Sequence, residues 1–172
     1  AYFFNQVDDS IALLLSCAQA FFGLAGPAIG NRRWMAAARP AVAGQFVFVA
    51  LSFAVLAWAF YKNDFSVLYV ANNSNSALPT FYRFSAGWGA HEGSLPLWAL
   101  SLSAWSIAVA VFSRNLPETF AARVLGVLGF ISIGFQGFIL FTSNPFERLV
   151  PAAQDGHDLN PLLQDVALAV HP

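Results

Sequence analysis

A histidine, a carboxylate and a tryptophan form the cluster best suited to chemistry in this sequence. His91 is followed by Glu92 and preceded by Trp88, in a segment that leads directly into a long apolar stretch. The N-terminus of a helix favours an anionic group, so these residues could form a polar site for a carboxylate at a membrane surface. The alternative is an ordinary helix start within a belt of interfacial aromatic residues, which needs no ligand. We therefore treat Trp88, His91 and Glu92 as a candidate surface site.

Two further histidines lie near the end of the chain, in different surroundings. His171 follows the apolar run 166–170, and an imidazole that enters the bilayer is costly to leave unpaired. It could bind a metal, a haem iron or a buried hydrogen-bond partner, or it could be an ordinary histidine at a helix end. His157 stands among acidic residues, which favours a solvated loop position.

The spacing of these residues excludes several common kinds of site. The single cysteine, Cys17, forms neither an internal disulfide nor a zinc or redox pair. No second histidine follows His91 at the interval of a metalloprotease helix, and Gly87 and Gly89 lack the third glycine of a dinucleotide-binding loop. With a formal net charge of -1 and no run of basic residues, the chain is not expected to bind nucleic acid.

The elements that must position these residues are apolar helices. Of the 172 residues, 58% are hydrophobic and only 10% are charged, and the mean hydropathy is +0.59. Four stretches without a charged residue are long enough to cross a hydrocarbon core of about 30 Å: 10–29, 41–61, 94–112 and 124–142. The sequence therefore predicts an all-α fold, a polytopic transmembrane helical bundle with four spans in contact with membrane lipid. Pro96 suits the first turn of the third span, and Ser94 or Gly93 suits its cap.

The distribution of cations predicts the topology of this bundle. The connections 30–40 and 113–123 hold 5 Lys and Arg residues in 22 residues, whereas the other 71 residues outside the spans hold 3. Positive charge collects on the cytoplasmic side, so both termini and the outer loops 62–93 and 143–172 are expected to face outward, to a periplasm or its equivalent. The chain starts at Ala1 and stops shortly after an apolar run, so we expect residues 1–172 to be a membrane fragment of a longer protein.

Small and polar residues recur along the fourth span at intervals of three or four, which places them on one helical face: Gly126, Gly129, Ser132 and Gln136. Such a face lets another helix approach closely and gives the glutamine side chain a partner. Ser16 and Gln19 in the first span are likewise expected to bond to a neighbouring helix. Because none of the four stretches carries an ionisable group, the sequence does not support an ion or proton path.

Several unusual strings, in order along the chain, resemble the N-terminal part of the CcmF/NrfE family of cytochrome c biogenesis proteins. They occupy 73–79, 88–95, 141–148 and 158–165, and an Ala-Val-His-Pro string at 169–172 follows the last of them. The resemblance runs from about residue 60 to the end, whereas the first two spans match only in hydropathy. CcmF serves general cytochrome c maturation and NrfE serves a nitrite reductase, and the strings do not separate the two.

The resemblance implies a haem lyase subunit in the bacterial inner membrane, with its main loops in the periplasm. Proteins of this family take haem from the chaperone CcmE and, with CcmH and CcmI, attach it through thioether bonds to apocytochrome c. They also hold a haem b, and the resemblance places one of its two axial ligands on His171. The second ligand and a tryptophan-rich haem-handling segment are expected beyond residue 172, so the fragment alone is not expected to be active. His157 stands where the family pattern has arginine, which argues against a shared role for it.

Two other classes of protein remain open at this point. A haem or solute transporter would also be polytopic, and it would be distinguished by an inverted repeat with broken helices in place of the tryptophan-rich segment. A purely structural assembly subunit would bind its partners without haem.

Overall fold

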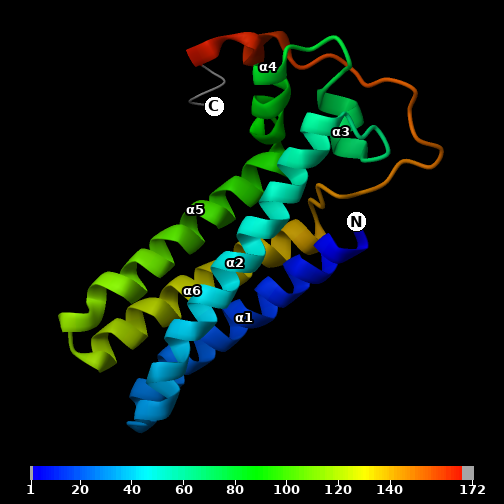
Figure 1. The fold of residues 1–172 in the computed structure, drawn as a ribbon. Coiled ribbons are helices and arrows are strands. Elements are labelled where there is room, and N and C mark those ends of the chain that lie inside the picture. The colour runs from blue at the N-terminus through cyan, green and yellow to red at the C-terminus, as the bar shows by residue number, and fades with distance from the viewer. Residues whose placement is uncertain (1, 168–172) are drawn as a thin grey trace.

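Four long helices form a bundle in the computed structural model, which describes residues 2–167 (Figure 1). They are α1 (Tyr2–Ile29), α2 (Arg32–Lys62), α5 (His91–Phe112) and α6 (Glu118–Phe141). Each is long and apolar enough to cross a membrane. Helices α1 and α5 each pack against both α2 and α6. Within residues 2–167 there is no strand, only an isolated bridge between Val67 and Arg148, so the predicted all-α polytopic bundle is confirmed.

The helices are joined by tight turns at one end of the bundle. Only Gly30 and Asn31 separate α1 from α2, and Gly30 takes a φ of 66°, which a residue without a Cβ adopts without strain. The Asn31 side chain caps α2 by accepting hydrogen bonds from two backbone N–H groups of its first turn. Between α5 and α6 lie the short helix η2 (Ser113–Asn115) and two further residues. Both connections are therefore shorter than the charge-bearing segments on which the predicted topology rests.

The predicted small face of the fourth span packs against α1. A Cβ at Gly126 would lie 2.8 Å from the backbone of Gly23, and one at Gly129 would lie 2.8 Å from the backbone of Ala20. The two helices approach closely because these positions carry no side chain. The Ser16 hydroxyl donates a hydrogen bond of 3.0 Å to Gln136 Oε1, so the predicted partner of this glutamine lies on α1.

A cap of short helices and loops covers the opposite end of the bundle, where α5 begins (Figure 1). It contains α3 (Leu68–Asn73), α4 (Thr80–Ser85), η1 (Ala86–Trp88) and η3 (Pro161–Gln164). Its core is continuous with the end of α2, because Leu56 and Phe60 pack with Val67, Val70 and Leu159. We call this the capped end of the bundle.

Two segments far apart in the sequence hold the cap together. The Leu68 N–H donates to Glu147 O at 2.8 Å, and the Leu149 N–H donates to Ser66 O at 3.0 Å. Further along, the His157 N–H donates to Ala71 O at 2.7 Å. The loop 143–160 is thus fixed against the start and the end of α3.

Candidate functional site

The start of α5 carries the predicted surface site, and a buried tyrosine fixes it in place. The Tyr69 hydroxyl donates to Ala86 O at 3.1 Å and accepts from the Ala90 N–H at 3.3 Å. Ala90 is the N-cap residue of α5 and its side chain makes no capping bond, so the phenol satisfies a helix N–H that would otherwise lack a partner. The helix begins at His91, and the expectation that Gly93 or Ser94 would cap it is wrong for this reason.

Gly93 allows the tyrosine to approach this closely. A Cβ at Gly93 would overlap both the Gly87 carbonyl oxygen and the Tyr69 hydroxyl. Burial raises the pKa of the Tyr69 phenol, and the nearby negative charge of Glu92 raises it further. The backbone N–H groups of Ala90 and Gly93 lower it in part. The phenol therefore stays protonated at neutral pH and acts as a fixed donor between η1 and α5.

His91 lies in a groove between α5 and α6, at the capped end of the bundle. Its Nδ1 is 3.2 Å from the Ser143 hydroxyl, and its ring packs edge to face on Phe138 with centroids 5.8 Å apart. The groove is shallow and open, with a volume of about 320 Å³, and its other lining residues are apolar: Leu95, Ile131, Gly134, Phe135 and Phe138. Because Nδ1 is engaged by the hydroxyl, Nε2 is the ring nitrogen left for a ligand.

The three predicted surface-site residues share one segment but contact different neighbours. Trp88, at the end of η1, packs edge to face on Phe84 with ring centroids 5.2 Å apart. Glu92 lies close enough to Tyr69 for its charge to act on the phenol, whereas His91 faces the groove. The structure therefore brings Trp88, His91 and Glu92 to one end of the bundle without directing them at a common point.

Hydrogen bonds join two polar segments of the cap, one around Ser76 and one at 155–158. Asp155 accepts hydrogen bonds from the Ser76 N–H at 3.0 Å, the Ser76 hydroxyl at 2.7 Å and the Gly156 N–H at 2.8 Å. These bonds lower the pKa of its carboxyl. Asn75 donates in the same way to Asp158. These hydrogen bonds hold the polar segment before α4 against the segment 155–158, so their residues have a structural role in the cap.

Of the other two histidines, only His157 lies within the described residues. His157 is exposed in the loop and is held through its backbone, as its acidic surroundings predict. His171 lies outside the described residues. Within residues 2–167, no group of three or more His, Cys, Asp and Glu side chains could hold a metal ion. The part of the chain that the structure describes therefore offers single ligands and no metal cluster.

Asp9 is a half-buried acidic residue that the hydropathy pattern did not single out. The sequence places it just before the first span, but α1 starts at Tyr2 and carries Asp9 inward, where Ser52 of α2 hydrogen-bonds to its carboxylate. The first span was predicted to begin at residue 10, whereas the helix of membrane-spanning length covers Val7–Ile29 and therefore includes Asp9. One signal was available, because Asp9, Ala12, Ser16 and Gln19 follow at helical intervals and share one face.

Known proteins resemble this chain over almost its whole length. A family model described as "Cytochrome C assembly protein" matches residues 88–172. The cytochrome c-type biogenesis protein CcmF of Pseudomonas aeruginosa is 60% identical over 94% of the chain, and that of Escherichia coli is 53% identical over 94%. NrfE of Haemophilus influenzae is 48% identical over 93%. The chain spans about a quarter of the length of these relatives, 25%, 25% and 26% respectively.

A solved structure extends this likeness to three dimensions. The structure of "Cytochrome c Heme Lyase CcmF" superposes with a TM-score of 0.86 at 28% sequence identity, covering 99% of this chain and 26% of that one. All four long helices and the cap are included in a match of this extent. The chain therefore belongs to the CcmF/NrfE family of cytochrome c biogenesis proteins and corresponds to its N-terminal part.

Proposed function

We propose that the complete protein is the haem lyase subunit of a cytochrome c maturation system. The observation that carries the proposal is the superposition of 99% of this chain on the CcmF haem lyase structure. In this role the protein would receive haem from CcmE and, together with CcmH and CcmI, support its attachment to apocytochrome c. The attachment adds cysteine thiols across the haem vinyl groups, so the contribution of the protein would be to orient the haem and the apocytochrome.

The capped end of the bundle is proposed to face the periplasm, in the inner membrane of a bacterium. The support comes from cations at the opposite end, where Arg39 donates hydrogen bonds to Ala110 O and to the Ser113 hydroxyl. Arg32 there forms an exposed ion pair of 3.2 Å with Glu118. These arginines lie at the end of the bundle where α1 is joined to α2 and α5 to α6, which is where positive charge is expected on a cytoplasmic face. The cap, the groove and both termini would then lie on the periplasmic side.

His171 is proposed as one axial ligand of a haem b, as the family resemblance implies. The described chain leads toward this residue along the cap, because Leu159 is buried in the cap core and Leu163 packs against it. A six-coordinate haem needs a second axial ligand, which would come from beyond residue 172. The haem supplies the redox-active iron, and the role of His171 would be to hold that iron and tune its potential.

His91 and its groove are proposed as a contact surface for haem in transit. The groove fits the edge of a porphyrin in two respects: its walls are apolar, and the second ring nitrogen of His91 is oriented by Ser143. Glu92 and Trp88 belong to the same segment but do not line the groove. In this role His91 would bind and position the haem, and no proton transfer is assigned to it.

A second candidate is a lyase subunit of the NrfE type, dedicated to a nitrite reductase. The 48% identity to NrfE of H. influenzae favours it, but the 60% identity to CcmF of P. aeruginosa favours general cytochrome c maturation more strongly. We therefore place the CcmF role first.

Complementation separates these roles. The full-length protein would be expressed in a strain that lacks its own CcmF and NrfE, and covalently bound haem would be stained in general c-type cytochromes and in nitrite reductase. Haem attachment to the general cytochromes supports the CcmF role, and attachment to nitrite reductase alone supports the NrfE role. If neither is restored while the protein reaches the membrane, the lyase proposal is wrong. His91→Ala should reduce attachment, whereas His157→Ala, an exposed loop variant, should not.

A further inference from the structure

Arg123 lies on the exposed side of α6, near the end of the bundle opposite the cap. Hydropathy placed it just before the fourth span, but α6 begins at Glu118, so Arg123 belongs to the second turn of the helix. Its neighbours at helical intervals are Phe120, Val127 and Phe130, which are 56%, 51% and 66% exposed. We call these three residues the exposed stripe of α6. The other three long helices leave this stripe uncovered, so in a membrane it contacts lipid.

The depth of Arg123 in the membrane follows from the length of its helix. The 24 residues of α6 extend over about 36 Å, whereas the hydrocarbon core of a bilayer is about 30 Å thick. Arg123 lies about 7.5 Å from the start of α6, which places it near the border between hydrocarbon and headgroups. Side chains of a helix tilt toward its N-terminus, so the guanidinium leans toward the headgroups. A charge at this border is costly unless it reaches the interface and finds an anionic partner.

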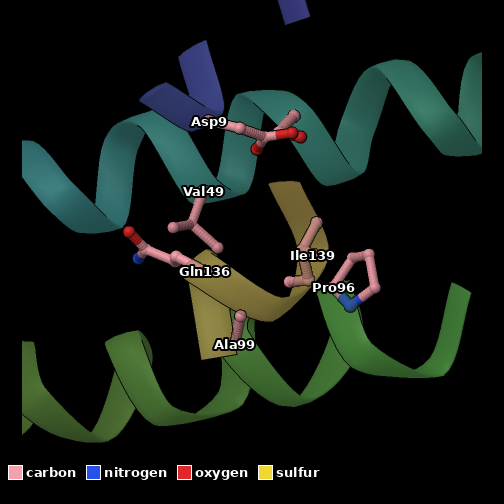
Figure 2. A pocket seen from close by; sticks show the side chains of 7 residues that line it. Asp9, Val49, Pro96, Ala99, Gln136 and Ile139 are labelled. Carbon is pink, nitrogen blue, oxygen red and sulfur yellow. The ribbon is translucent and has the colours of Figure 1, made fainter. Parts of the chain in front are cut away.

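The bundle itself does not supply that partner. Within residues 2–167, Glu118 is the only acidic residue at this end, and it pairs with Arg32 at 3.2 Å. Arg123 forms neither a hydrogen bond nor an ion pair with any residue of the described chain. Asp9 of α1 differs in this respect, because it lies beside α2, where Ser52 hydrogen-bonds to its carboxylate (Figure 2). The partner of Arg123 must therefore come from outside the four helices.

A phospholipid headgroup has the chemistry that this position requires. Phosphate oxygens accept the parallel N–H bonds of a guanidinium, and headgroup phosphates lie at the border that Arg123 reaches. The exposed side chains of Arg33 and Arg114 add to the positive charge of this end, which favours a lipid with a net negative charge. The acyl chains of a lipid would also cover the exposed stripe of α6. A free phosphate ion has no such apolar part and gains nothing from the stripe.

We propose that Arg123 and the exposed stripe of α6 form a binding site for an anionic phospholipid. The Arg123 guanidinium donates hydrogen bonds to the headgroup phosphate, and the acyl chains lie along Phe120, Val127 and Phe130. The site requires only that α6 spans a membrane. It is independent of the haem-handling role, because it lies at the opposite end of the bundle from the cap and the predicted haem contacts.

The site is tested by native mass spectrometry of the delipidated full-length protein in detergent, to which phosphatidylglycerol is added. The native protein should form a phosphatidylglycerol adduct. In Arg123→Gln the dissociation constant of this adduct should rise at least about tenfold, the factor expected for the loss of one charge-assisted hydrogen bond. Arg123→Lys keeps the charge and should bind more tightly than Arg123→Gln. Equal weakening in these two variants would overturn the role assigned to the charge.

A matched control is Arg114→Gln, which removes the same charge from η2 at the same end of the bundle. Its affinity for phosphatidylglycerol should stay close to that of the native protein. An equal loss in Arg114→Gln and Arg123→Gln would overturn the proposal, because general attraction to the charged end would then explain the binding. Because the Arg123 side chain is exposed, Arg123→Gln should melt at the native temperature in lipid-free detergent, so weaker binding reports the lost contact.

Two further measurements identify the occupant. Phosphatidylcholine with the same acyl chains has no net charge and should bind more weakly than phosphatidylglycerol, and equal binding would overturn the assignment to an anionic lipid. An excess of inorganic phosphate should leave the adduct in place, and its displacement would show that the site binds a free phosphate ion. If the native full-length protein forms no adduct, another part of the protein covers the stripe and the proposal is wrong.

Discussion

Removal of one hydroxyl group, in Tyr69→Phe, tests how the start of α5 is held. The phenylalanine ring keeps the edge-to-face contact with Phe60, whose centroid is 5.2 Å away, so the packing of the cap core is preserved. Ala86 O retains a donor, because the Gly89 N–H also bonds to it at 3.1 Å. The Ala90 N–H, in contrast, loses the phenol as its acceptor. The Gly93 N–H, which also acts on the phenol, keeps Ala90 O as an acceptor at 3.2 Å, so the Ala90 N–H is the one left without a partner.

The magnitude follows from that single group. A buried N–H left without a partner costs about 1–3 kcal/mol, which corresponds to a local opening that is roughly 5-fold to 150-fold more frequent. Hydrogen–deuterium exchange of the full-length protein in detergent measures this directly at the amides of the first turn of α5. Exchange should accelerate there and remain unchanged in the middle of α6.

A matched control is Tyr61→Phe, in which an exposed tyrosine at the end of α2 loses the same hydroxyl. This variant should leave exchange at the start of α5 unchanged. Unaltered protection in Tyr69→Phe, or an equal acceleration in both variants, would refute the argument that the phenol fixes α5.

Three further predictions concern the cap and the bundle. Gly156→Ala should destabilise the cap by about 1–3 kcal/mol, because the new Cβ would overlap the Ser74 carbonyl oxygen. Gly137→Ala, whose new Cβ would meet open space, should not lower the melting temperature. Thermal unfolding of both variants checks this. The hydrogen bonds that lower the pKa of Asp155 should stabilise the cap fully above its unfolded value of 3.8, and this stability should be lost as the pH falls through the lower folded value. The stability difference between the native protein and Asp155→Asn should therefore shrink in acid, and a difference independent of pH would contradict the sign. Ser16→Ala should destabilise the bundle by about 0.6–1.7 kcal/mol through loss of its bond to Gln136, measured by unfolding in mixed micelles, and no change would show that the bond contributes nothing.

The membrane bundle could be predicted because its causes are local. Runs of apolar residues long enough to cross the bilayer specify helices, and the intervals between Gly126, Gly129 and Gln136 specify the face that packs. The start of α1 at Tyr2 was not predicted, because Asp8 and Asp9 precede the apolar stretch 10–29. A hydropathy window ends where charges begin, whereas the helix continues through Asp9 because its carboxylate finds Ser52 on a neighbouring helix. That contact is not visible along the sequence.

The cap and the surface site were predictable only in part. The position of His91 and Glu92 at a helix start follows from the sequence. The capping group was not predictable, because the hydroxyl that serves the Ala90 N–H comes from Tyr69, 21 residues earlier. The groove beside His91 likewise depends on Phe138 and Ser143 of a later segment. Tertiary contacts of this kind determine which way each side chain of the site faces.

The haem-handling account is tested most directly by the haem content of the purified full-length protein. Pyridine haemochrome spectra would be recorded for the native protein, for His171→Ala and for His157→Ala at equal protein levels. The account predicts a b-type haem that His171→Ala strongly depletes and that His157→Ala, an exposed loop variant in the same segment, leaves intact. Unchanged haem content and an unchanged spectrum in His171→Ala would contradict the assignment of this residue as an axial ligand.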